Sequence, residues 1–209
     1  MMKILILGAA GRTGRELVTQ AMAGGNEVTA FARATEHLPT LEGLRVIVGD
    51  AENPDQVAAA AQGNDAVVSA LGHTSTMRSA AQTVAIQTLI KTLPAGTKVI
   101  SLTGFGVPDA KDPAIPLLGK IMNGVIKLVP GDMFNDGRRH VELLRASKLA
   151  YTVVRAPRLT TAAGTGHYEL GYFSLSATDA IARADVAAAM LGCLSNNTWD
   201  RQTPMIRAQ

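Results

Sequence analysis

Three glycines near the start of the chain have a spacing that can bind a phosphate. Gly8, Gly11 and Gly14 follow the apolar run Lys3–Leu7 and lead into a segment, 12–23, whose apolar residues fall on one helical face. In such a strand-to-helix turn, one glycine permits the tight turn, the next lets the backbone approach the ligand, and the third lets the helix pack closely on the sheet. The free N–H groups and the positive end of the helix dipole then face the anion. The pattern predicts a site for a dinucleotide pyrophosphate, with a plain glycine-rich turn as the alternative.

A basic residue stands where the adenosine ribose of a dinucleotide would be recognised. Arg33 follows the second apolar segment, Glu27–Ala32, about twenty residues beyond the glycine turn. An Asp or Glu here would accept hydrogen bonds from the ribose hydroxyls of NAD, whereas a basic side chain suits the 2′-phosphate of NADP. The Thr35 hydroxyl could add to this phosphate site. We therefore expect NADP(H); the alternative for Arg33 is an ordinary solvated arginine at a strand end.

Two further segments end in residues suited to the same ligand. Asp50 and Ala51 follow the apolar segment Arg45–Val48, and the Asp50 carboxylate could accept a hydrogen bond from the adenine amino group. The alternative is a plain turn or cap aspartate. Leu71 and Gly72 follow the next apolar segment, where small residues let the backbone run close to the ribose and pyrophosphate.

These residues need a sheet whose strands end at one common edge. Strands are predicted at Lys3–Leu7, Glu27–Ala32, Arg45–Val48, Ala66–Ser69, Lys98–Ser101, Tyr151–Arg155 and Thr203–Ile206. Helices are predicted at Arg12–Ala23, Pro54–Gln62, Ser75–Thr92, Gly137–Ser147 and Arg183–Leu194. This alternation predicts the α/β class: a Rossmann-like, doubly wound parallel sheet with helices on both faces, in a single NAD(P)-binding domain over residues 1–209.

The segment 104–134 is irregular. It holds four of the nine prolines, and its middle part, 115–129, is strongly apolar. An insertion after the fifth strand of such a sheet lies outside the carboxyl ends of the strands, over the cofactor cleft. We expect a substrate-side insertion that covers the acceptor; the alternatives are a helix packed on the body or a subunit contact.

The composition excludes several classes of protein. With 47% hydrophobic and 18% charged residues, the chain is globular, and it has neither a run of about 20 apolar residues for a membrane span nor a signal-peptide core. The net charge of +3 is spread along the chain and only 4% of residues are aromatic, which argues against nucleic-acid binding. One cysteine, Cys193, allows no internal disulfide and fits a cytoplasmic protein. We interpret Cys193 as a packing residue.

Several stretches together resemble a known family. The chain is similar to atypical short-chain dehydrogenases/reductases with an NAD(P)-binding, NmrA-like Rossmann domain, and most similar to the biliverdin-IXβ reductase/flavin reductase branch. The resemblance is carried by the segments 6–14, 48–50, 65–72, 141–147, 151–157, 164–168 and 181–187, which follow in family order over essentially the whole chain.

The resemblance implies an NADPH-dependent reductase of flavins, quinones or tetrapyrrole-like acceptors. It assigns the cofactor to Gly8, Gly11, Arg12, Thr13, Gly14, Arg33, Thr35, Asp50, Ala51, Leu71, Gly72, Thr103 and Pro157. It places Thr103 near the nicotinamide, where the hydroxyl would orient cofactor or substrate. It places Arg158 on the substrate side of the nicotinamide, so that Thr103 and Arg158 are the two candidate catalytic residues.

The chain also departs from related enzymes. Phe134 and Arg138 align with the Tyr and Lys that many short-chain dehydrogenases use for proton donation, and phenylalanine has no proton to give. Arg158 aligns with a histidine of the biliverdin-reducing relative; an arginine is no general acid near neutral pH, but it could attract an acidic substrate. A flavin or quinone takes its proton from solvent, so these acceptors are favoured over simple carbonyls.

Two other functions stay open. A non-catalytic NADP(H)-binding redox sensor or interaction protein of the NmrA-like type is the main alternative, and an isomerase-like enzyme with bound NADP is a weaker one. We expect no metal, and a monomer or weak homodimer. Of the remaining polar residues, Ser101 is expected to be structural, His140 to lie at the surface, and Asp185 to cap a helix or charge its first turn.

Overall fold

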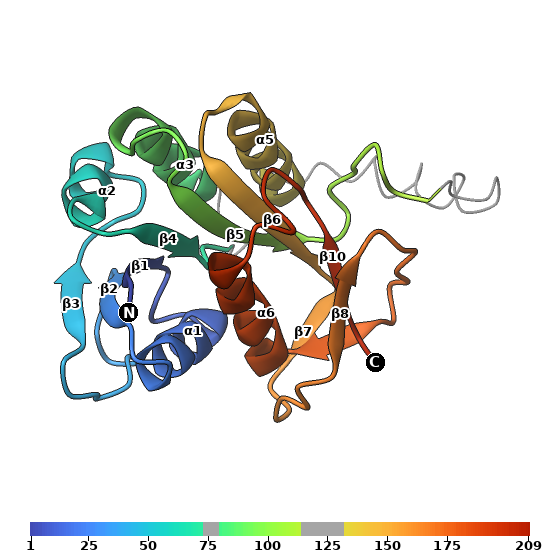
Figure 1. The fold of residues 1–209 in the computed structure, drawn as a ribbon, viewed down its shortest axis with the longest axis horizontal. Helices are drawn as coiled ribbons and strands as arrows, with labels where there is room; N and C mark the ends of the chain where they lie inside the picture. Colours follow the sequence, from blue (N-terminus) through green and yellow to red (C-terminus); the bar gives the residue numbers. More distant parts are fainter. Residues whose placement is uncertain (73–79, 114–131) are drawn as a thin grey trace.

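The computed structural model describes residues 1–72, 80–113 and 132–209 (Figure 1). The strands are β1 (Lys3–Leu7), β2 (Glu27–Ala32), β3 (Arg45–Val48), β4 (Ala66–Ser69), β5 (Lys98–Gly104), β6 (Ala150–Ala156), β7 (Arg158–Thr160), β8 (Tyr168–Gly171), β9 (Ala180–Ala182) and β10 (Met205–Ala208). The helices are α1 (Arg12–Ala23), α2 (Pro54–Ala61), α3 (Ala81–Thr92), α5 (Asp132–Ala146) and α6 (Arg183–Ser195).

The main sheet has the strand order β3-β2-β1-β4-β5-β6-β10-β8. All neighbouring pairs are parallel except β10 and β8, which pair antiparallel. The chain runs outward from β1 to β3 and then returns to the other side of β1 with β4, so the strand order reverses between β1 and β4. In sheets of this kind the ligand crevice lies at that point, outside the carboxyl ends of the strands. The predicted α/β class and doubly wound sheet are confirmed.

β1 is buried on both faces because helices cover both sides of the sheet (Figure 1). Ile4 and Ile6 belong to the apolar core that includes residues of α1 and α6. Leu5 and Leu7 belong to a second core with residues of α2, α3 and α5. Successive strand residues point to opposite faces, which is why a continuous apolar run was needed here rather than an alternating one.

The predicted bounds of the first four strands and of α1 agree with the structure. β5 and β6 extend further than predicted, and α5 begins at Asp132 rather than Gly137. α3 is described from Ala81; residues 75–79 of the predicted helix lie outside the described part. The short strands β7, β8 and β9 were not predicted, because three or four residues carry too little periodicity to be recognised.

The segment after β5 is described as far as residue 113, so most of the predicted insertion, 114–131, lies outside the described residues. Its beginning is fixed by Arg155 of β6, which has no exposed surface. The Arg155 guanidinium donates to the Val107 carbonyl (2.6 Å) and to the Asp112 carboxylate (2.8 Å). These bonds hold Val107 beside the carboxyl end of β5.

Candidate functional site

The glycine turn after β1 is held by its own backbone contacts. Gly8 has φ +74°, a left-handed conformation that favours glycine, and its N–H donates to the Phe31 carbonyl (3.1 Å). A Cβ on Gly14 would lie 2.1 Å from the Gly8 carbonyl oxygen, so α1 approaches the turn as closely as it does only with glycine here. Gly11 is the residue directly before α1, so the first turn of the helix follows the glycine turn at once. The turn has the features that the sequence predicted for a phosphate site.

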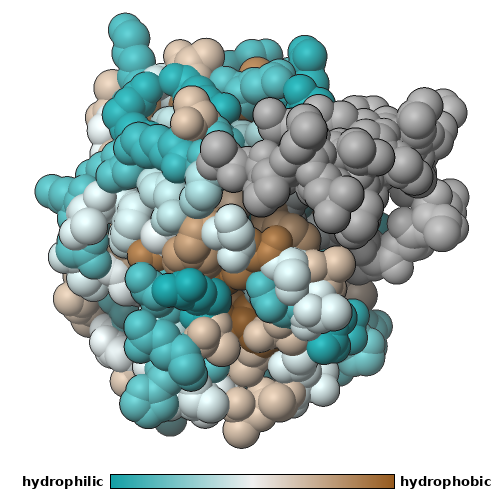
Figure 2. Space-filling model, turned by 90° about the vertical axis from the view of Figure 1, so that its right-hand side faces the viewer, coloured by the Kyte–Doolittle hydropathy of each residue, from teal (hydrophilic) through white to brown (hydrophobic). Residues whose placement is uncertain are grey.

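A cavity of about 310 Å³ lies along the carboxyl edge of β1, β4, β5 and β6. Seen toward this side of the molecule, apolar surface fills the middle of the face and hydrophilic residues border it (Figure 2). The described lining residues are Gly11, Arg12, Thr13, Ala70, Leu71, Gly72, Gln82, Leu102, Thr103, Gly104, Val107, Ala156, Pro157, Leu159 and Arg183. The structure therefore brings together the predicted residues Gly11, Arg12, Thr13, Leu71, Gly72, Thr103 and Pro157.

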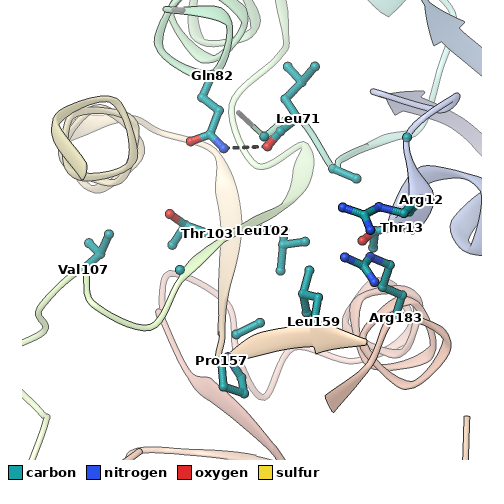
Figure 3. Close-up of a pocket in the computed structure, with 15 residues that line it drawn as sticks. Arg12, Thr13, Leu71, Gln82, Leu102, Thr103, Val107, Pro157, Leu159 and Arg183 are labelled. Carbon is teal, nitrogen blue, oxygen red and sulfur yellow. Dashed lines mark hydrogen bonds between the residues drawn. The ribbon is translucent and has the colours of Figure 1, made fainter. Parts of the chain in front are cut away.

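One end of the cavity carries a hydroxyl and an amide (Figure 3). Thr103, at the end of β5, is 9% exposed, and its hydroxyl has no hydrogen-bond partner among the described residues. The α5 backbone lies against it, because a Cβ on Gly137 would be 2.9 Å from Thr103 Oγ1. Gln82, from the first turn of α3, donates from Nε2 to the Leu71 carbonyl (2.5 Å).

The oxygen of this amide is unusual. Gln82 is 7% exposed, and no donor among the described residues reaches its buried Oε1. A buried acceptor without a partner costs free energy, so it points to a donor from a bound molecule. Sequence reasoning missed Gln82, because a lone glutamine at the start of a helix carries no pattern.

The opposite end of the cavity is cationic. Arg12, the first residue of α1, and Arg183, the first residue of α6, direct their guanidinium groups into the same space beside Thr13 (Figure 3). Between the two ends lie Leu102 and Leu159, which form an apolar stretch. Arg183 was also missed from the sequence, since nothing in the local pattern indicates that the start of α6 approaches the start of α1.

The residues predicted to contact the adenosine lie beyond this cavity, after β2 and β3. Arg33 and Thr35 are exposed, directly after β2. Asp50 follows β3, and its Oδ1 accepts from the Glu52 N–H (3.0 Å), as a turn aspartate does. Ala51 is buried. The adenine role of Asp50 and the phosphate role of Arg33 stay predictions.

The two residues predicted near the substrate, Pro157 and Arg158, lie in different places. Pro157 lines the cavity, whereas Arg158, the next residue, is exposed on β7 and is not among the described lining residues. Arg138 is exposed on α5, and Phe134 belongs to the first turn of the same helix. The role of Arg158 toward the acceptor stays a prediction.

The expectation that His140 lies at the surface is wrong. Its side chain has no exposed area, because α5 turns this face toward β5. His140 Nε2 is 3.1 Å from Ser101 Oγ, so the two form a buried hydrogen bond. Burial lowers the pKa of His140 to about 4, although the Asp136 carboxylate opposes this shift. The histidine is therefore neutral near pH 7.

The other polar residues behave as packing or positioning groups. Burial raises the pKa of the Cys193 thiol to about 11, which agrees with a packing role. The Asp185 carboxylate accepts from the N–H groups of Thr165 (3.1 Å) and Gly166 (2.9 Å), so it fixes the loop before β8. Within residues 1–72, 80–113 and 132–209, no group of three His, Cys, Asp or Glu side chains could hold a metal ion, and no helix has the length and apolar character to cross a membrane.

Comparison with known proteins identifies a family and a fold. The sequence model of a family described as NAD(P)H-binding matches residues 8–197. A 3-beta-hydroxysteroid dehydrogenase of Mycolicibacterium neoaurum is 37% identical over 65 residues, a match that covers 31% of this chain and 18% of that protein. The matched stretch is thus less than a fifth of the length of that dehydrogenase.

Several solved structures are similar over nearly the whole chain. A short-chain dehydrogenase/reductase of Veillonella parvula DSM 2008 in complex with NADP has a TM-score of 0.78 at 22% identity, covering 99% of this chain and 94% of that one. A candidate NADH-flavin reductase of Streptococcus pneumoniae TIGR4 has 0.75 at 22%, covering 100% of both chains. ChuY, an anaerobillin reductase of Escherichia coli O157:H7, has 0.74 at 23%, covering 99% of this chain and 97% of that one. At these identities the likeness shows the fold.

Proposed function

This chain belongs to the NAD(P)H-binding family, and we propose that it is an NADPH-dependent reductase that transfers hydride to a flavin, a quinone or a similar conjugated acceptor. The observation that carries this proposal is the make-up of the cavity beside the glycine turn. It has a cationic end at Arg12, an apolar middle, and a hydroxyl–amide end at Thr103 and Gln82. This order suits a dinucleotide whose pyrophosphate and nicotinamide lie at opposite ends.

The residues fit the cofactor on two counts. The turn presents the start of α1 to an anion, and Gln82 Oε1 is a buried acceptor that lacks a donor among the described residues. We propose that Gln82 Oε1 accepts from the nicotinamide amide or a ribose hydroxyl, and that the Thr103 hydroxyl bonds to the same end of the cofactor. Arg33 would bind the 2′-phosphate and so favour NADPH over NADH.

NADPH, when bound, supplies a hydride; the acceptor takes this hydride and one proton, giving NADP⁺ and the two-electron-reduced acceptor. The chain has to orient the acceptor against the nicotinamide and exclude water. Leu102, Pro157 and Leu159 supply apolar surface for a planar ring.

The arginines Arg12 and Arg183 are the only ionisable side chains among the described lining residues, and they do not give up protons near neutral pH. An acceptor that takes its proton from solvent fits this cavity better than a simple ketone, which needs a positioned acid. The similar structures include a candidate NADH-flavin reductase and an anaerobillin reductase, which supports the same choice.

The absence of an acid from the described lining also supports the second candidate, a non-catalytic NADP(H)-binding sensor. Both functions require tight NADPH binding, so turnover separates them. The test is oxidation of NADPH, and in parallel NADH, by the purified chain with FMN, riboflavin, a quinone and biliverdin offered separately. Turnover with any acceptor, reduced at least about tenfold by Thr103→Val, supports the reductase. NADPH binding without turnover would support the sensor instead.

A further inference from the structure

The two arginines at the cationic end of the cavity face each other although they come from distant parts of the chain. Arg12 opens α1 and Arg183 opens α6, and both line the same space (Figure 3). Burial lowers the pKa of Arg183, and the neighbouring charge of Arg12 lowers it further. Two guanidinium groups held this close repel each other, so the arrangement favours a bound anion between them.

No carboxylate in the described part of the chain forms an ion pair with either arginine. Neither guanidinium forms a hydrogen bond or an ion pair with any described residue. Two other arginines of the chain have such partners: the fully buried Arg155 binds Asp112, and the exposed Arg145 binds Asp109. Arg12 and Arg183 therefore differ from the structural arginines in leaving their charge free for a ligand.

A second cavity, of about 330 Å³, adjoins the first, since Arg12 and Arg183 line both. Besides Arg12 and Arg183, its lining includes Arg15 of α1, Thr160 at the end of β7 and Thr161 directly after it. One carboxylate, Glu16, also lines it and is not in ion-pair contact with the arginines. Three guanidinium groups against one carboxylate, together with hydroxyl donors, suit a phosphate or a carboxylate.

The place of this cavity separates it from the adenosine half of the cofactor. Figure 1 shows β2 and β3, which precede Arg33 and Asp50, on one side of α1, and β7 on the other. The adenosine is expected on the β2 side. We therefore assign a group in the second cavity to the acceptor rather than to the adenosine, with the acceptor ring between Thr103 and Leu159.

We propose that Arg183, together with Arg15, binds an anionic tail of the acceptor, a phosphate or a carboxylate, which extends into the second cavity, while Arg12 binds the cofactor pyrophosphate. The inference rests on the proposed function, since it presumes an acceptor ring over the apolar middle of the first cavity. It makes Arg183 a residue that selects acidic acceptors over neutral ones with the same ring.

The test compares acceptors that differ only in charge. Binding of FMN and riboflavin, and of biliverdin and its dimethyl ester, is measured by calorimetry on NADP⁺-saturated protein, so that no turnover is needed. In the wild type, FMN and biliverdin bind at least about tenfold more tightly than their neutral counterparts. Arg183→Gln weakens the anionic ligands about 10- to 100-fold and leaves the neutral ligands unchanged.

Arg139→Gln is the matched control, because Arg139 is exposed on α5 and lines neither cavity. It should change no affinity. A loss for FMN alone assigns the site to phosphate, and a loss for biliverdin alone to carboxylate. Equal binding of charged and neutral ligands, no binding by any of the four, or an effect of Arg183→Gln confined to NADP⁺ affinity would overturn the inference. Binding without reduction would overturn only the proposed function.

Discussion

Ser101 and His140 form a hydrogen bond inside the core, with Ser101 Oγ 3.1 Å from His140 Nε2. Both side chains are buried between β5 and α5. Ser101 lies on β5, two residues before the cavity residue Thr103. Asp136, one turn earlier on α5, accepts from the Thr83 N–H (3.0 Å) and so joins α5 to α3. This polar layer positions the helix that lies on Thr103.

The buried histidine makes stability depend on pH. Its pKa is lowered to about 4, so between pH 6.5 and 4 the unfolded chain binds a proton that the folded chain does not. The free energy of unfolding should therefore fall by roughly 3 kcal/mol over this window as the pH decreases. Urea denaturation at several pH values measures it. His140→Leu should remove this component while Ser101→Ala keeps it; equal pH slopes for His140→Leu and the wild type would contradict the assignment.

Gly14 tests the close approach of α1 to the turn. Gly14→Ala would place a methyl group 2.1 Å from the Gly8 carbonyl oxygen and 2.8 Å from the Ala9 backbone, neither of which can move freely. We expect a loss of about 3 kcal/mol of stability and of NADPH binding. Gly192→Ala, in α6, is the control: its Cβ meets nothing within 4 Å, and it should stabilise by about 0.5–1 kcal/mol. Urea denaturation and NADPH titration compare the two variants.

Arg33 tests the choice between nicotinamide cofactors. If it binds the 2′-phosphate, Arg33→Gln removes a charge-assisted hydrogen bond, and the Kd for NADPH should rise about 10- to 100-fold with little change for NADH. Arg45→Gln is the control, because Arg45 is an exposed arginine at the opposite, amino-terminal end of β3. Fluorescence titration with both cofactors measures the effect. A parallel loss for NADPH and NADH, or none, would remove Arg33 from the phosphate site.

Gln82 tests whether the buried acceptor serves the cofactor. Gln82→Leu keeps the size of the side chain and removes Oε1, so the Kd for NADPH should rise about 5- to 10-fold. Gln20→Leu is a matched control, since Gln20 also donates to a backbone carbonyl, that of Ala184 (3.0 Å), without lining the main cavity. If Gln82 is only structural, thermal denaturation will show a loss of stability while the NADPH affinity stays at the wild-type value.

Asp112 tests the ion pair with Arg155, the residue that also binds the Val107 carbonyl and holds Val107 at the cavity. Arg155 is fully buried, so Asp112→Ala leaves a buried charge without its carboxylate and should cost about 3 kcal/mol of stability. Glu169→Ala breaks the exposed pair with Arg207 and should cost less than about 1 kcal/mol. Urea denaturation of both variants measures the contrast. Similar small losses in the two would show that the Arg155 guanidinium finds other partners.

By itself the sequence determined the strand, the glycine turn and the helix on which the site is built. A buried β1, three glycines at fixed spacing and a following amphipathic helix are local patterns, because the strand, turn and helix that they specify are consecutive in the chain. The same holds for the residues that follow strands β3, β4 and β5, since the carboxyl ends of parallel strands meet at one edge. Asp50, Leu71 and Thr103 could therefore be placed at that edge without coordinates.

The tertiary structure alone decided which distant side chains meet there. Arg183 reaches Arg12 because α6 packs beside α1, and Gln82 reaches the cavity because α3 begins above β4. His140 lies inside rather than outside because the packing of α3 and α5 sets which face of α5 meets β5. These contacts join residues 11 to 171 positions apart, and no local periodicity in the sequence predicts them. The glycine turn could be predicted from the sequence because consecutive residues form it. The charged groups and hydrogen-bond acceptors around the turn could not, because their positions depend on how the helices pack.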